Sequence, residues 1–404
     1  MFDAAADRLK RSDINFRLLI PLMLSAAAVQ AVTAIARVTT SYRVVELDLP
    51  VIWIGIISAD FALLPAFFAL WLGRFIDRGH DALAAWIGAV LMVFANAGLM
   101  VSGGSKTLLL AATALFGIAH LFMIVSQQML CVRCSRRRSR ESVFGNYMVA
   151  VALGQGLGPL IVGWAGGSAT VPPTQFLFVV GLVGAVLALA CTAPIRPSPS
   201  RLAAEAGKAV MPVRDLLRLP GLWAVMFASI ITVTSGDLIV IYLPLLGAER
   251  LIDAGNIGGL LTARALASMA ARLLYARMIA LFGRVPLMVA SLGSGSAAFA
   301  CLAVPMPVLL LYVVTAATGF TVGIANTITI TTVVAMTSAG VRATANSLRV
   351  TGNRIAQVAL PFGASLVAAI AGTASIFAII AASLVLSGLA VYRSQPGGRT
   401  PNDG

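Results

Sequence analysis

Apolar runs of about 20 residues recur along the whole chain, and charged residues gather between them. A helix of that length crosses the ~30 Å hydrocarbon core of a bilayer. Backbone groups in lipid must be hydrogen-bonded within the chain, so such runs cross as helices. The pattern predicts an all-α polytopic membrane protein with twelve transmembrane helices. Their predicted spans are residues 18–41, 51–72, 84–102, 107–132, 142–164, 175–195, 221–246, 257–276, 285–304, 307–336, 346–371 and 375–392.

Composition supports the same class. Of the 404 residues, 59% are hydrophobic and only 11% are charged, whereas a soluble domain has about 25% charged residues. Residues 1–16 lack the apolar core and small-residue cleavage site of a signal peptide, so the first span is expected to be retained.

Positive charge is distributed unevenly between the two sets of span ends. Most of the 29 lysines and arginines lie at the N-terminus, in alternate loops and in the tail, while Arg43, Lys106 and Arg250 lie at the opposite ends. This bias predicts a cytoplasmic (inner) membrane protein with both termini in the cytoplasm. The basic run "RCSRRRSRE" is then interpreted as an orientation signal that contacts lipid headgroups. The net charge of +14 therefore does not indicate a nucleic-acid partner.

The chain divides into two similar halves of six spans. A stretch rich in proline, serine and basic residues predicts a cytoplasmic linker over 196–220, between halves at 1–195 and 221–404. A shift of about 200 residues aligns the halves, and it pairs Glu46 with Glu249, Arg74 with Arg277, Gln155 with Gln357, and Pro159 with Pro361. An even number of spans per half makes this a parallel repeat, which predicts a substrate site between the halves near the membrane midplane.

A charged turn follows the second span in "GRFIDRGH". Gly73, Asp77 and Arg78 fit the pattern Gly-x-x-x-Asp-Arg-x-Gly-Arg, although His80 departs from it. Arg272 and Arg277 hold corresponding places in the second half, where Ala280 replaces the acid. Together with the repeated halves, these motifs resemble the major facilitator superfamily over nearly the whole chain. The resemblance implies alternating access, with these five residues forming a conformational latch in which Gly73 lets two helices approach.

The fifth span contains "GNYMVAVALGQGLGPLIVG", which is rich in residues that weaken helices. Gly154 and Gly158 form a small-xxx-small face for close helix packing, and Pro159 permits a bend. Gly145, Gly154, Gly158 and Pro159 fit Gly-x8-Gly-x3-Gly-Pro, which is similar to the fifth-helix motif of the family's drug/proton antiporters. Generic helix packing is the alternative interpretation. Thr113 stands where many proton-coupled members have an arginine.

Ionisable residues inside spans are expensive, and they indicate functional sites. Asp237, Asp60 and His120 are the candidates for proton coupling, since a carboxyl group that alternates between an apolar site and an arginine partner can carry a proton. The alternative for the acids is a structural ion pair, Asp60 with Arg37 and Asp237 with Arg264. For His120 the alternative is a hydrogen-bonded packing role.

Further polar residues are candidates for the substrate cavity. They are Arg264, Arg354, Asn353, Gln357, Arg37 and Gln127. Arg354 and Gln357 are three residues apart, so they share a helix face. A helix–helix hydrogen-bond cluster is an equally valid interpretation of the residues around Arg354.

These features predict a secondary transporter of small organic or amphipathic solutes, with proton-coupled export as the leading hypothesis. Proton-coupled uptake of an organic anion is the alternative, because arginines outnumber acids inside the spans. A non-transporting membrane sensor is an alternative of a different class. No enzyme motif or phosphate-binding loop is found, so we expect no enzyme activity, cofactor or metal. The expected partners are the small-molecule substrate, protons and membrane lipids, and a monomer is expected.

Overall fold

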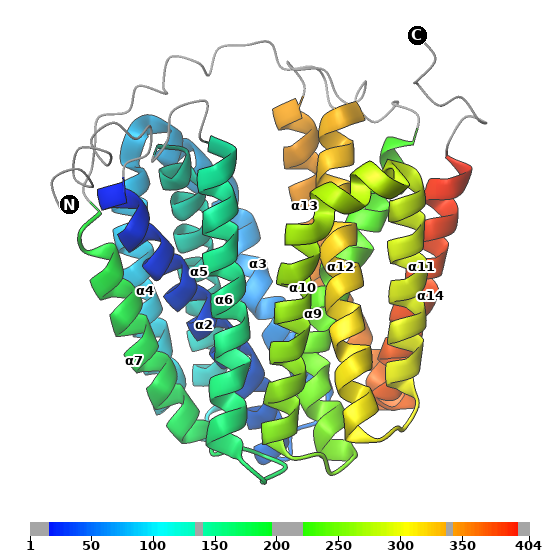
Figure 1. Ribbon diagram of the computed structural model, residues 1–404. Helices are drawn as coiled ribbons and strands as arrows, with labels where there is room; N and C mark the ends of the chain where they lie inside the picture. The colour runs from blue at the N-terminus through cyan, green and yellow to red at the C-terminus, as the bar shows by residue number, and fades with distance from the viewer. Residues whose placement is uncertain (1–15, 134–139, 196–220, 337–341, 395–404) are drawn as a thin grey trace, which may run out of the picture. The chain divides into compact units, whose positions relative to one another are not determined.

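The computed structural model describes residues 16–133, 140–195, 221–336 and 342–394, and these parts are helical apart from short turns. Twelve of the helices in these ranges are long and apolar enough to cross a membrane, which confirms the predicted number of spans. The elements are α2 (Phe16–Glu46), α3 (Ile52–Phe75), η1 (Ile76–His80), α4 (Asp81–Val101), α5 (Lys106–Arg133), α6 (Arg140–Gly166), α7 (Thr174–Thr192), α9 (Leu222–Glu249), α10 (Ala254–Phe282), α11 (Arg284–Ala303), α12 (Val308–Met336), α13 (Arg342–Ala371) and α14 (Ala374–Arg393) (Figure 1).

The helices form two compact units. Unit 1 takes in Met1–Asp48, Asp60–Ala206 and Asp253–Gly258, and unit 2 takes in the remainder. These units differ from the predicted halves at two short segments, because Leu49–Ala59 is grouped with unit 2 and Asp253–Gly258 with unit 1. The linker predicted over 196–220 lies outside the described residues.

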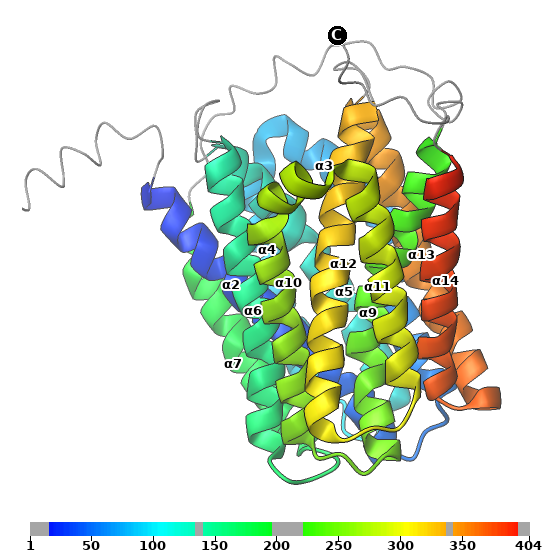
Figure 2. The ribbon, with the colours of Figure 1, turned by 45° about the vertical axis from the view of Figure 1, so that its right-hand side comes forward.

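The two units use the same internal packing scheme. In unit 1, α2 packs against α6 and α7, and α4 packs against α5 and α7. In unit 2, α9 packs against α13 and α14, and α11 packs against α12 and α14 (Figure 2). Each contact of unit 1 therefore has its counterpart one repeat later, as expected for a duplicated six-helix unit.

Small residues allow a close helix approach between α2 and α6 in unit 1. Gly154 and Gly158 of α6 face α2, and a Cβ built on them would come within 2.2 Å of the Ala27 carbonyl oxygen and 2.6 Å of the Ala31 carbonyl oxygen respectively. Any side chain at these positions would push the two helices apart. The small-xxx-small face of "GNYMVAVALGQGLGPLIVG" thus lies at the α2–α6 contact.

One end of unit 1 is held together by a polar group in which Arg43 and Thr174 are buried and Glu46 is exposed. The Thr174 hydroxyl at the start of α7 donates to the Glu46 carboxylate at the end of α2. Arg43 donates to Glu46 at 3.1 Å, to the Thr174 Oγ1 at 2.9 Å and to the Gly103 carbonyl at 2.7 Å. Arg43 is only 8% exposed. We call Arg43, Glu46 and Thr174 the unit 1 clamp.

Unit 2 contains an equivalent arrangement. The Thr373 hydroxyl, just before α14, donates to Glu249 at the end of α9. Arg250 donates to the carbonyl oxygens of Ala303 and Val304, at 3.0 and 3.2 Å, at the end of α11. Glu249, Arg250 and Thr373 are the unit 2 clamp. The repeat that aligned Glu46 with Glu249 in the sequence is therefore also a repeat of hydrogen bonding.

Candidate functional site

A chain of polar side chains connects α9 and α13 inside unit 2. Arg354 Nη1 donates to Gln357 Oε1 at 3.1 Å, and Gln357 Nε2 donates to Asp237 Oδ2 at 2.8 Å. The three-residue spacing on α13 brings Arg354 and Gln357 onto one face, as the sequence predicted. All three side chains are half-buried. The amide of Gln357 thus links a guanidinium to a carboxylate within membrane-spanning segments.

A second polar contact lies earlier on the same two helices, about two turns before Asp237 on α9 and one turn before Gln357 on α13. Ser229 Oγ of α9 accepts from Arg349 Nη1 at 3.1 Å and from Asn353 Nδ2 at 3.5 Å. Arg349 and Asn353 are each only 8% exposed. Asn353 Oδ1 is also buried, and no hydrogen-bond partner for it is found in the described parts of the chain. Because buried polar atoms are normally paired, Asn353 Oδ1 is a candidate contact for substrate or water.

The local sequence of α13 explains why this helix can present polar groups at mid-membrane. Pro361 has no N–H to bond the carbonyl of Gln357, so the ladder is interrupted beside the polar chain. Tyr242 of α9 donates its hydroxyl to the Pro361 carbonyl at 2.8 Å, which fixes the two helices there. We call Asp237, Arg354, Gln357, Asn353, Arg349 and Ser229 the α9–α13 cluster. Ser229 was missed from the sequence, because a lone serine in an apolar helix gives no signal.

Arg264 lies close to this cluster on α10. A Cβ built on Gly236 would lie 3.8 Å from Arg264 Nη1, so the guanidinium is beside the residue that precedes Asp237. A Cβ on Gly319 of α12 would meet the Arg264 carbonyl oxygen at 2.1 Å, so α10 and α12 are in close contact there. Sequence reasoning assigned Arg264 as the partner of Asp237, and it did not anticipate the hydrogen bond from Gln357.

In unit 1, Asp60 and its neighbours form a separate group. Arg37 is positioned over the Phe61 ring, with Cζ 5.4 Å from the centroid, and the His120 ring centroid is 5.4 Å from that of Phe61. Asp60 Oδ2 is buried, and it has no hydrogen-bond partner among the residues that the structure describes. The predicted alternative of an Asp60–Arg37 ion pair is therefore not seen, because the Arg37 guanidinium stacks on the ring next to Asp60 in a cation–π contact.

Gln127 occupies the interior of unit 1. It is 1% exposed, and its Nε2 donates to Ser25 Oγ at 3.0 Å, while Ser25 shares a 2.9 Å hydrogen bond with Thr192. Its amide joins α5 to α2 and α7. Gln127 Oε1 is buried, and it has no hydrogen-bond partner among the described residues, so the substrate-cavity role of Gln127 stays a prediction.

The remaining residues of the antiporter-like motif lie on α6. Pro159 is buried within this helix. Gly145 also lies in α6, but its surroundings are outside the described part of the chain. The motif therefore meets α2 through Gly154 and Gly158.

The structure describes only part of the predicted conformational latch. Asp77 and Arg78 lie in η1, just before Gly79, whose φ of 93° turns the chain into α4. Their side chains fall outside the described residues. A Cβ built on Gly73 would meet nothing within 4 Å, so the close helix approach predicted at this glycine is not seen.

On α10, Arg272 is half-buried and Arg277 is exposed. The hydrogen bonds that join the end of α10 and the start of α11 to α12 are made by residues other than Arg272 and Arg277. Tyr275 and Thr331 share a 2.6 Å hydrogen bond, and Arg284 Nη1 donates to Thr331 at 3.1 Å. This contact was not predicted from the sequence, because its three residues lie on three different helices.

One buried acid near the first latch was also missed. Asp81 begins α4, is 0% exposed, and accepts a hydrogen bond from the Ala82 amide at 2.8 Å. An acid at a helix start interacts favourably with the helix dipole, and this was the signal available in the sequence.

Twelve spanning helices with charged and amide side chains buried among them define a polytopic membrane transporter. A family model described as Major Facilitator Superfamily matches residues 19–251 and 225–404. The chain belongs to this family. It is a secondary transporter rather than an enzyme.

Solved structures share the fold at low sequence identity. A D-xylose-proton symporter is 14% identical, with a TM-score of 0.78 over 94% of this chain and 98% of that chain. The nucleoside transporter NupG, in a mutant form, is 12% identical, with a TM-score of 0.76 over 93% of this chain and 99% of that chain. No curated protein matches the sequence.

Proposed function

We propose that the chain is a proton-coupled transporter whose coupling and substrate groups meet in the α9–α13 cluster. The observation that carries this proposal is the continuous Arg354–Gln357–Asp237 hydrogen-bonded chain. The ionised carboxylate of Asp237 can only accept hydrogen bonds, and the Gln357 amide group donates one to it. When Asp237 Oδ2 is protonated, its O–H group and the Gln357 N–H group are both donors. The hydrogen bond between Gln357 and Asp237 is then lost. Loss of that contact breaks the hydrogen-bonded path between Asp237 and Arg354.

Substrate binding can use the same groups. Arg349, Arg354 and Asn353 provide donors, and Asn353 Oδ1 provides a buried acceptor. A substrate that takes the Gln357 or Arg354 hydrogen bonds competes with the ionised form of Asp237. Such competition between a proton and a substrate is the minimum requirement for exchange.

Export by proton antiport is our preferred direction. It is supported by the resemblance of the α6 glycine pattern to that of the family's antiporters, and by the α2–α6 contact made by Gly154 and Gly158. The substrates would be small organic or amphipathic solutes. The termini would be cytoplasmic in an inner membrane, and the transporter would act as a monomer.

A second candidate is proton-coupled uptake of an organic anion. The basic character of the α9–α13 cluster favours it, since Arg349 and Arg354 both lie there and Arg264 lies beside Gly236. A guanidinium recognises carboxylate or phosphate oxygens with two parallel hydrogen bonds.

Asp60 and His120 in unit 1 are the second proposed proton site.

The deciding experiment uses proteoliposomes with an imposed pH gradient and an internal pH dye. A panel of organic anions and neutral amphipathic compounds is added to either side. Antiport predicts that an added substrate moves protons in the opposite direction to itself, and symport predicts movement in the same direction. If none of the compounds moves protons while some are transported, the proton-coupling proposal is wrong.

A further inference from the structure

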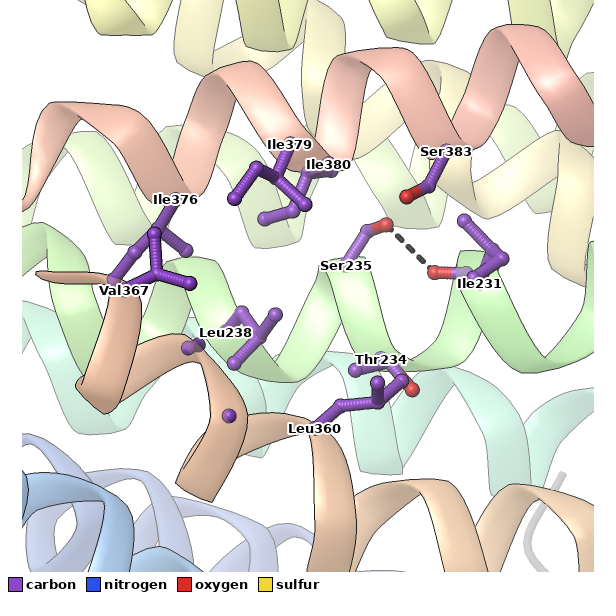
Figure 3. Close-up of a pocket in the computed structure, with 12 residues that line it drawn as sticks. Ile231, Thr234, Ser235, Leu238, Leu360, Val367, Ile376, Ile379, Ile380 and Ser383 are labelled. Atoms are coloured by element: carbon purple, nitrogen blue, oxygen red, sulfur yellow. Dashed lines mark hydrogen bonds between the residues drawn. The ribbon is translucent and has the colours of Figure 1, made fainter. Parts of the chain in front are cut away.

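A pocket of about 270 Å³ lies among α9, α13 and α14 of unit 2. Its wall is mainly aliphatic, with Leu238, Val367 and Ile380 among its residues, and it contains no charged side chain (Figure 3). Ser235 lines it too, but its hydroxyl donates to the Ile231 carbonyl at 2.6 Å. Thr234 Oγ1 and the Ser383 hydroxyl are the other polar groups of the wall, and Thr234 Oγ1 has no hydrogen-bond partner among the described residues. The pocket therefore suits an uncharged and largely apolar occupant.

The pocket is open at the surface of these membrane-spanning helices. Leu360 and Ile379 line it and remain 37% and 49% exposed. Gly363 leaves a gap in the α13 wall, because a Cβ there would meet nothing within 4 Å. The helices that form the wall all have the length and hydropathy of membrane spans. Hydrocarbon is thus the surrounding medium from which an occupant would enter.

The depth of the pocket matches part of one leaflet. On α14 it extends from Ile376, two residues after the helix start, to Ser383. Those eight residues cover about 10 Å along the helix, against about 15 Å for half of the hydrocarbon core. On α9 the lining residues, from Ile231 to Leu238, lie near the middle of the helix. The pocket therefore runs from close to one membrane interface toward the midplane.

We infer that this pocket binds one acyl chain of a membrane lipid, with the headgroup at the end near the α13–α14 turn. An empty apolar cavity of about 150 Å³ already binds benzene, so this pocket holds a longer stretch of hydrocarbon. Lipid tails are as apolar as leucine, so the chain is held by packing rather than by escape from water. The site is separate from the α9–α13 cluster and does not rest on the proposed coupling mechanism.

The test uses the purified full chain in vesicles of phosphatidylcholine that contain a fraction carrying a diazirine in the middle of one acyl chain. After illumination, labelled peptides are mapped by mass spectrometry. We expect labelling concentrated on residues 360–367 and 376–383. Gly363→Phe fills the pocket and should reduce this labelling to the level of other lipid-exposed peptides. Gly293→Phe is the matched control, because a Cβ on Gly293 also meets nothing within 4 Å but Gly293 does not line the pocket.

A second pocket variant and a second photoreactive probe complete the test. If Gly363→Phe does not give a monodisperse protein, Ala364→Phe fills the same pocket from the adjacent position. A short diazirine-carrying alkyl sulfonate tests an amphipathic solute as the occupant. Labelling that is unchanged in both pocket variants overturns the inference, and so does labelling by the sulfonate but not by the lipid. Equal loss in Gly293→Phe would also overturn it.

Discussion

Gly158 of α6 lies against Ala31 of α2 so closely that a Cβ on the glycine would come within 2.6 Å of the Ala31 carbonyl oxygen. The same Cβ would lie 2.6 Å from the Ala34 Cβ. This contact explains the glycines of "GNYMVAVALGQGLGPLIVG". They cost helix propensity, and they allow two membrane helices to meet at backbone distance.

Gly158→Leu should abolish transport while the protein still inserts in the membrane. Overpacking of this kind costs about 1–3 kcal/mol and moves the backbone. Transport in proteoliposomes and membrane abundance are measured together. Gly293→Leu, at an open position of α11, is the control and should transport normally. Normal transport by Gly158→Leu would show that the α2–α6 contact adapts without functional cost.

Asp237→Asn should abolish proton-driven accumulation and keep substrate binding or exchange. Asparagine retains an oxygen that accepts from Gln357, but it cannot take up a proton. Substrate-induced proton movement is measured in liposomes. Asp60→Asn is compared in the same assay and should have the smaller effect. Proton movement at the wild-type rate in Asp237→Asn would make Asp237 a structural residue.

Gln357→Leu should strongly reduce coupled transport, because it breaks the link between Arg354 and Asp237. Gln155→Leu is the matched control, because Gln155 is the repeat equivalent of Gln357. Gln155 is exposed, and its Nε2 reaches Gln30 Oε1 only at 3.4 Å. Initial rates at saturating and limiting substrate separate binding from turnover. Equal effects of the two substitutions would argue against a special role for the α9–α13 cluster.

Thr174→Val should destabilise unit 1, since it leaves the Glu46 carboxylate without a hydroxyl donor. Loss of one partner of a buried hydrogen bond costs about 1–3 kcal/mol. The cost here should lie at the lower end, because the Glu46 side chain is 39% exposed. The thermal unfolding midpoint of the purified protein should fall, and Thr174→Ser should restore it. Thr107→Val, at an exposed position of α5, is the control. An unchanged midpoint in Thr174→Val would show that Arg43 alone holds this end of the unit.

Labelling of single cysteines tests the predicted topology. In a background without Cys131, Cys134, Cys191 and Cys301, a cysteine at Ser168 should react with an impermeant reagent from outside. A cysteine at Ser198, which lies outside the described residues, should react only after permeabilisation. Ser168 is exposed in the turn between α6 and α7. Equal labelling of both positions from outside would contradict the twelve-span arrangement.

The spans could be predicted from sequence because hydrophobic length alone determines them. The shared face of Arg354 and Gln357 was also accessible, since it depends on spacing within one helix. The partners of Asp237 and Asp60 were not, because they depend on how each helix is rotated toward its neighbours. An Asp60–Arg37 ion pair was the alternative interpretation, whereas the guanidinium stacks on adjacent Phe61. A polar glutamine inside a span, such as Gln127, suggests a cavity residue from sequence. Only the packing of the neighbouring helices shows that its side chain is enclosed.

The clamps have a consequence for biogenesis. Glu46 and Thr174 are separated by 128 positions, and Glu249 and Thr373 by 124. The carboxylate at the end of the first helix of each unit therefore lacks its threonine partner until synthesis of the sixth helix begins. Domains generally fold in order of synthesis. The unit 1 clamp can thus form while the ribosome is still translating the second half of the chain, and chains arrested before Thr174 should remain susceptible to degradation by membrane proteases.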